Sequence, residues 1–219
     1  MIEAPERSLA RDAAIRAMLP YVPLDGWTQR ALSSGLVALG EAPEVGRKLF
    51  PDGAVGMFEA WCDLTDREME AVAGGAHALP EDLGLAARIR ALMALRLRQL
   101  HPYREALRRG LALLAGAGSA PAAARITLRT MDSIWDAAGE RATDFSWYTK
   151  RASLAAIYAA TLLYWLADPS EEGEAALAFF DRRIAGLVAF SRLRRGFAGA
   201  CARVLLPRHA ASSAANSRG

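Results

Sequence analysis

The chain has 219 residues, of which 53% are hydrophobic, and it carries a formal net charge of +3. This length and apolar content exclude a disordered chain and suffice for a sizeable core. The only cysteines, Cys62 and Cys201, and the three histidines lie far apart in the sequence, so they indicate neither a disulfide framework nor a metal site. Alanine, leucine and arginine dominate and runs of β-branched residues are few, which favours helix over strand.

Four helices are predicted in the first third of the chain. Apolar residues at helical spacing, bounded by proline and glycine, place them at 8–19, 28–39, 44–49 and 54–73. Pro20 and Pro23 are expected to end the first helix, because proline cannot continue it.

The order of these elements resembles the helix-turn-helix head of TetR-type regulators. Gly26-Trp27-Thr28 at the start of the second helix and Leu49-Phe50-Pro51-Asp52-Gly53 after the third stand where that head has comparable residues. In such a head, residues 44–49 would form the recognition helix that enters a major groove.

The charges of this head argue against DNA as its partner. Residues 1–60 contain six basic and eight acidic residues. Affinity for DNA comes largely from neutralised phosphates, and Glu41 and Glu44 flank the expected recognition helix. We therefore expect no nucleic-acid partner.

The rest of the chain is expected to form a larger helical bundle without strands. Proline in the first turn or a capping side chain predicts helices at 81–99, from Pro102, from Pro121 to Ala138, from Asp144 or Ser146 to Ala167, from Ser170, and at 189–206. The expected units are a head at 1–53, a bundle at 54–188, a basic amphipathic helix at 189–206 and a disordered tail at 207–219.

The segment 143–168 is the most informative one. Residues 152–167 contain no charge but are fewer than the roughly twenty that cross a bilayer, so we expect a buried helix. Trp147 and Tyr148 precede this apolar run, next to Arg151. Aromatic residues and arginine often anchor interfaces, so they form a candidate partner-binding patch. The alternative is that both rings pack the start of the helix into the core.

The run DFSWYTKRASLAAIY at 144–158 carries a family resemblance. Together with the preceding Asp132-Ser133-Ile134-Trp135 and Gly139, and the following Asp168, it is similar to the hallmark of the accessory lipid-binding family of ubiquinone (coenzyme Q) biosynthesis. The TetR-like head and the basic last helix occur in the same order as in that family, so the resemblance covers nearly the whole chain.

The resemblance implies a TetR-like fold that binds an isoprenoid quinone or precursor in an apolar cavity. It also implies presentation of that lipid to a membrane-associated enzyme, the demethoxyubiquinone hydroxylase, through a surface near the Trp-Tyr motif. Carried onto this chain, the partner-binding residues would be Ile134, Asp144, Trp147, Tyr148 and Arg151. TetR-like folds often pair through their last helices, so a homodimer is expected.

A quinone precursor needs a long slot lined by apolar side chains. The lipid-binding residues expected in the bundle are Leu128, Met131, Tyr158, Leu162, Trp165 and Leu166. Plain core packing is the alternative for each of them.

The last helix is predicted to lie in a membrane interface. Leu193, Phe197, Cys201 and Val204 share one face, and the other side carries Arg192, Arg195 and Arg203. From Arg182 onward the chain has eight arginines and no acidic residue. Each arginine near an anionic surface contributes on the order of 1 kcal/mol. The alternative is that the apolar face docks on the body or on a second copy.

No nucleotide-binding, metalloprotease or nucleophile-elbow motif is present, so we expect a protein that is not an enzyme and has no cofactor. The N-terminus is acidic, unlike a secretory or transit segment, and we expect a cytoplasmic location, peripheral on the inner face of a bacterial membrane. The alternatives are a TetR-type transcriptional regulator with a hydrophobic effector and a helical adaptor without a ligand.

Overall fold

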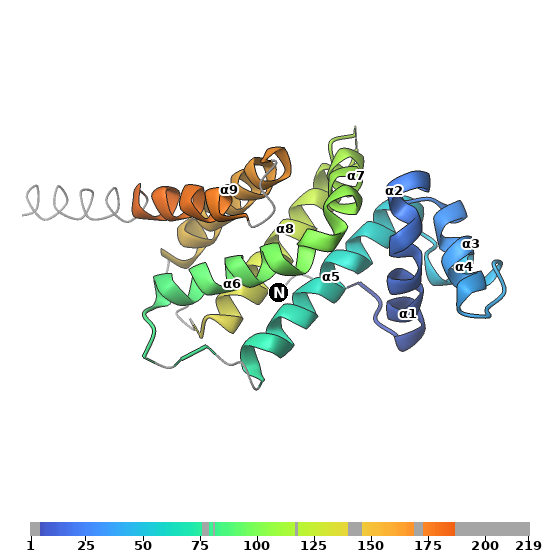
Figure 1. The fold of residues 1–219 in the computed structure, drawn as a ribbon, viewed down its shortest axis with the longest axis horizontal. Helices are drawn as coiled ribbons and strands as arrows, with labels where there is room; N and C mark the ends of the chain where they lie inside the picture. Colours follow the sequence, from blue (N-terminus) through green and yellow to red (C-terminus); the bar gives the residue numbers. More distant parts are fainter. Residues whose placement is uncertain are drawn as a thin grey trace, which may run out of the picture.

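The computed structural model describes residues 5–75, 79–80, 82–116, 118–139, 146–168 and 173–186. Within these ranges all regular structure is helical, which confirms the all-α prediction (Figure 1). The α-helices are α1 Leu9–Met18, α2 Val22–Asp25, α3 Gln29–Ala38, α4 Val45–Leu49, α5 Gly53–Gly74, α6 Leu85–Leu100, α7 Arg104–Leu114, α8 Ala120–Ala137 and α9 Ser146–Ala167. Residues 174–186 are also helical.

Helices α1 to α4 lie together at one end of the molecule (Figure 1). Side chains cap α1 and α3, because Ser8 accepts from the backbone N–H of Arg11 and Thr28 from that of Ala31. The two helices cross closely at Gly35, where a Cβ atom would lie 2.7 Å from the backbone nitrogen of Met18. The head therefore depends on a glycine at its main crossing.

The first helix ends close to its predicted boundary, because α1 ends at Met18 and Leu19 is its C-cap residue. A 3-10 turn, Leu19–Tyr21, and α2 follow α1 directly, which the sequence did not predict. Pro20 and Pro23 each occupy the first turn of their element, where the missing N–H costs no hydrogen bond, and Gly26 with φ 72° ends α2. The start of α6 differs from the prediction: α6 begins at Leu85 rather than near Glu81, because Gly84 has extended backbone at the N-cap position.

Helix α5 connects the head to the remaining helices and packs against α6, α7 and α8 (Figure 1). Three aromatic rings fill the junction between the head and α5. The ring centroid of Trp27 in the head lies 5.4 Å from those of both Phe58 and Trp61 in α5. The indole Nε1 of Trp27 donates to the carbonyl of Ala106 on α7 at 2.9 Å. This contact ties the head to the body.

Among the described helices, none combines the length and the apolar character needed to cross a bilayer.

Gly110 of α7 lies directly on the Phe58 ring, so close that an added Cβ would overlap the ring atoms. We expect Gly110→Ala to lower the free energy of unfolding by about 1–3 kcal/mol, because α7 or the ring must move. Denaturant unfolding measures the change. Gly74→Ala is the matched control, since nothing lies within 4 Å of its Cβ position. An equal or smaller loss in Gly110→Ala than in the control would contradict this packing.

Candidate functional site

A stripe of acidic side chains runs along the buried side of α5. Glu59, Asp63 and Asp66 are spaced by four and three residues, which places them on one face of the helix. Their exposed fractions are only 8%, 4% and 4%. Buried carboxylates need partners, and each of these three has at least one arginine.

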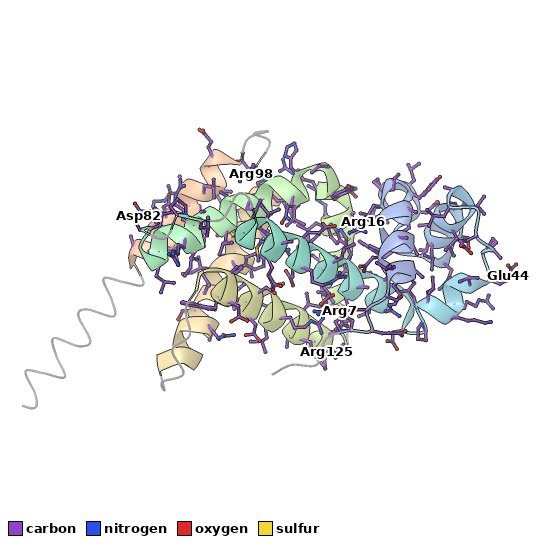
Figure 2. All side chains as sticks on the ribbon, turned by 90° about the horizontal axis from the view of Figure 1, so that it is seen from below. Arg7, Arg16, Glu44, Asp82, Arg98 and Arg125 are labelled. Atoms are coloured by element: carbon purple, nitrogen blue, oxygen red, sulfur yellow. The ribbon has the colours of Figure 1, made fainter. Side chains whose placement is uncertain are left out.

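The first two carboxylates join α5 to other elements. Glu59 accepts from Arg125 and Arg129 of α8 at 2.9 and 2.6 Å, and these bonds lower its pKa although burial alone would raise it. Asp63 binds Arg7 at 2.6 Å and Arg67 at 3.0 Å. Figure 2 shows Arg7 and Arg125 near the part of α5 that adjoins the head.

The third carboxylate belongs to a buried polar cluster, which we define as Asp66, Arg96, Thr130 and Tyr158. Asp66 Oδ1 lies 2.7 Å from Arg96 Nη2, and the Thr130 hydroxyl donates to Asp66 Oδ2 at 3.0 Å. The Tyr158 hydroxyl interacts with the same guanidinium. Helices α5, α6, α8 and α9 thus each supply one side chain to this cluster.

Burial governs the protonation of this cluster. It raises the pKa of Asp66 to about 6, against the opposing effect of Arg96. Burial is the largest single influence on the pKa of Arg96 and acts to lower it, but Asp66, Tyr158 and Cys62 together outweigh burial and the pKa is raised. The neighbouring Cys62 thiol has its pKa raised by burial to about 12, so it is a protonated, apolar neighbour.

Arg96 is not fully satisfied by these contacts. Only 2% of the residue is exposed, yet Nε and Nη1 have no hydrogen-bond partner in the described part of the protein. A buried charged donor without an acceptor loses the hydrogen bonds it would make in water.

The predicted lipid-binding residues occupy α8 and α9. Tyr158, Leu162 and Trp165 are buried on α9, and Met131 is fully buried on α8. Leu166 is half-buried, whereas Leu128 is 39% exposed at the surface. The structure therefore brings Met131 and the three α9 residues into one apolar core, and it leaves Leu128 outside it.

The end of α9 is held by two arginines from α7. Arg104 donates to the carbonyls of Trp165 and Asp168 and stacks on the Trp165 ring at 4.6 Å. Arg108 donates to the Leu166 carbonyl at 2.9 Å. Cations are favourable at the C-terminus of a helix, so these contacts fix the position of Trp165.

The predicted partner-binding residues are only partly described. Ile134 is buried, with 2% exposed, and Arg151 is buried in an ion pair with Asp132. Asp144 lies outside the described residues, as do the side chains of Trp147 and Tyr148, whose backbone begins α9. The predicted membrane-binding residues also lie outside the described part: Arg192, Leu193, Arg195, Phe197, Cys201, Arg203 and Val204.

The polar cluster was not predicted from the sequence. The sequence pattern gave little signal for it, since Glu59, Asp63 and Asp66 lie on the face of the helix opposite Met57, Trp61 and Leu64. Acidic residues on that side are ordinarily in contact with solvent, and only the packing of α6, α8 and α9 around α5 buries them.

The Asp66–Arg96 pair yields a stability prediction. We expect Arg96→Met to lower the free energy of unfolding at pH 8 by about 3–5 kcal/mol, because it leaves a buried carboxylate without a counter-charge. The double variant Asp66→Asn/Arg96→Met should recover most of this loss. If the single and the double variant lost the same free energy of unfolding, the Asp66–Arg96 pair would not be energetically coupled.

The same variant should depend on pH in a defined direction. The folded-state pKa of Asp66 lies above its ordinary value of 3.8 and rises further without Arg96. Folding then favours the protonated form of Asp66. The contribution of this group to the free energy of unfolding is fully present below about pH 4 and is lost as pH rises through its folded-state pKa. Urea unfolding of Arg96→Met should accordingly give a higher stability relative to the parent at pH 5 than at pH 8.

Comparison with a family model places the most informative segment in a known domain. Residues 120–191 match the model described as COQ9. This range covers α8 and α9 and includes the whole run at 144–158.

Curated relatives extend the similarity toward the head. The human protein named "Ubiquinone biosynthesis protein COQ9, mitochondrial" is 32% identical over 178 residues, covering 78% of this chain and 55% of the human protein. The Drosophila melanogaster protein of the same name is 33% identical over 165 residues, covering 73% of this chain and 49% of that protein. The chain thus spans about half the length of the curated relatives it matches.

A solved structure shows the fold. The crystal structure of a TetR transcriptional regulator from Nitrosomonas europaea ATCC 19718 matches with a TM-score of 0.64 and 22% identity, over 81% of this chain and 97% of that one. The predicted TetR-like fold is confirmed. The predicted family resemblance is confirmed as well: this chain is a TetR-like relative of the COQ9 proteins, with a COQ9 domain over residues 120–191.

Proposed function

We propose that the protein is a non-catalytic accessory protein of ubiquinone biosynthesis. It holds an isoprenoid quinone or precursor in its body and presents it to the demethoxyubiquinone hydroxylase or another membrane-associated enzyme of the pathway. The observation that carries this proposal is the COQ9 match over residues 120–191, supported by the names of the mitochondrial relatives. That range contains the six lipid-binding residues and the five partner-patch residues that the sequence predicts.

The buried side of α9 supports the lipid-binding part. Leu154, Tyr158, Leu162 and Trp165 follow one another at spacings of four, four and three, and all are buried. With a rise of about 1.5 Å per residue, they form a strip about 16 Å long on one face of the helix. A long apolar strip with one polar interruption suits a lipid that has an apolar tail and a small polar ring.

The membrane and oligomer parts of the proposal rest on the sequence pattern. An apolar stripe with an arginine-rich opposite face at 189–206 would hold the protein on the inner face of a bacterial membrane, near the enzyme that takes up the lipid. The protein would act there as a homodimer.

The first test is mass spectrometry of an organic extract from the natively expressed protein. We expect isoprenoid quinones or their precursors to be enriched over an extract of an unrelated helical protein. A variant truncated after Ala189 should retain the lipid, because the slot lies in the body. Lipid at the background level in the full-length protein would overturn lipid binding, and loss of lipid on truncation would move the site to the last helix.

The partner patch requires a separate test. We expect Trp147→Ala to weaken co-purification of the demethoxyubiquinone hydroxylase at least tenfold while leaving the extracted lipid unchanged, because a central aromatic anchor typically contributes 2 kcal/mol or more. Tyr164→Ala is the matched control, since Tyr164 is a 40% exposed aromatic residue on the same helix. Equal effects of the two substitutions would contradict a specific patch at Trp147.

The TetR-like fold favours a second candidate, a transcriptional regulator with a hydrophobic effector. Three arginines of the head argue against this candidate, since they bind within the protein. Arg7 and Arg16 pair with Asp63 and Glu68 of α5, and Arg11 is buried against the Phe50 ring. Arg47 and Lys48 remain exposed on α4, while Figure 2 places the acidic Glu44 at the tip of the head. A surface with this balance attracts phosphates weakly.

A further inference from the structure

The unpaired donors of Arg96 point to a ligand atom. The guanidinium has five N–H groups and no acceptor function, and Asp66 occupies only the Nη2 side. Nε and Nη1 lie on either side of Nη2, so both flanks of the ion pair still offer donors. Because only 2% of the residue is exposed, bulk water does not reach these donors. The Tyr158 hydroxyl beside the guanidinium can accept from one of them, and an oxygen of a ligand or of a buried water can accept from the rest.

The charge of the site limits what this acceptor can be. Asp66 and Arg96 form a buried pair whose charges cancel, and Thr130 and Tyr158 add only hydroxyl groups. A carboxylate or phosphate would bring a second, uncompensated negative charge into this interior, at a high desolvation cost. A neutral carbonyl, hydroxyl or ether oxygen accepts hydrogen bonds without that cost.

The surroundings extend the site on both sides along α9. Leu154 and Leu162 stand one turn before and one turn after Tyr158, with 3% and 5% exposed. Met131 of α8 adjoins Thr130 in sequence and is fully buried. The polar cluster therefore interrupts a strip of apolar side chains. Such a surface matches a ligand that has an oxygen-bearing ring attached to an apolar chain.

We propose that Arg96, held in place by Asp66, is the polar end of the ligand site and donates hydrogen bonds to an oxygen of a neutral ring carried by an isoprenoid chain. Tyr158 lines the same end through its hydroxyl group. This inference rests on the proposed function and adds to it the residue that recognises the head group.

The test compares two probes with the same isoprenoid tail, one with ring oxygens and one without. One is a short-tailed ubiquinone, and the other is a benzene ring with the same isoprenoid tail and no oxygen. Tryptophan quenching gives the dissociation constant of the quinone, and displacement of the quinone gives that of the hydrocarbon. We expect the full-length protein to bind the quinone about tenfold more tightly than the hydrocarbon, as one to two buried hydrogen bonds would give.

Paired substitutions then assign the preference to residues. Asp66→Asn/Arg96→Met should bring the affinity ratio close to one by weakening quinone binding alone. Tyr158→Phe keeps the ring and should reduce the ratio by about threefold. The matched control is Glu59→Gln/Arg129→Met, which removes another buried ion pair of α5 and should keep the full ratio. Melting curves establish that each variant is folded, and Tyr158→Phe carries the test if the double variant is not.

The outcomes separate this inference from the proposed function. Equal affinities for the quinone and the hydrocarbon in the parent protein would overturn the head-group assignment but not the proposal of lipid binding. An unchanged affinity ratio in both the Asp66→Asn/Arg96→Met and Tyr158→Phe variants would do the same. In that case a buried water satisfies Arg96. Binding of neither probe by the parent protein would overturn both proposals.

Discussion

The buried acidic stripe of α5 is the constraint on which the rest of the structure depends. Glu59 fixes α8, Asp63 fixes the N-terminal segment, and Asp66 fixes α6, each through arginine. Arg67 of the same helix forms a further ion pair with Asp12 of α1, which joins α1 to α5. Placing these charges in the interior has a large desolvation cost, and only close pairing offsets it. Helices that slid past one another by one turn would separate the pairs, so the stripe sets the register of the helices around α5.

The same pairing supports the proposal that the TetR-like head serves a purpose other than DNA binding. Three arginine side chains of this head bind within the protein, and one of them, Arg11, donates to the Leu49 carbonyl and stacks on the Phe50 ring at 4.5 Å. Arg7 and Arg16 reach across to α5. A positive charge that is neutralised by a carboxylate within the protein no longer releases counterions from DNA. Under that proposal the head is a folded extension of α5, held against α7 by the hydrogen bond from Trp27.

Local rules predicted the fold well, because glycine, proline and capping residues act over a few positions. Ser8 and Thr28 begin α1 and α3 as expected. Pro20 and Pro23 each lie in the first turn of a new element, and this was not predicted because the sequence does not tell whether a proline closes one helix or opens the next. The site was harder to predict. Apolar spacing could not separate Leu128, which is exposed, from Met131, which is buried, and the polar cluster joins four helices by contacts distant in sequence. The family resemblance pointed to α8 and α9 but not to Arg96.

The incomplete pairing of Arg96 links stability to occupancy. Under this inference, a ligand oxygen accepts from Nε or Nη1, and a ligand that binds only the folded state stabilises it by mass action. An apolar tail alone would gain from the strip on α9 but would leave the guanidinium unsatisfied. The same buried charge that holds α6 against α5 would therefore select for a ring with oxygens over a bare hydrocarbon. The Asp66–Arg96 ion pair would then serve both the fold and the choice of ligand, since Asp66 positions the guanidinium that donates hydrogen bonds to the ligand.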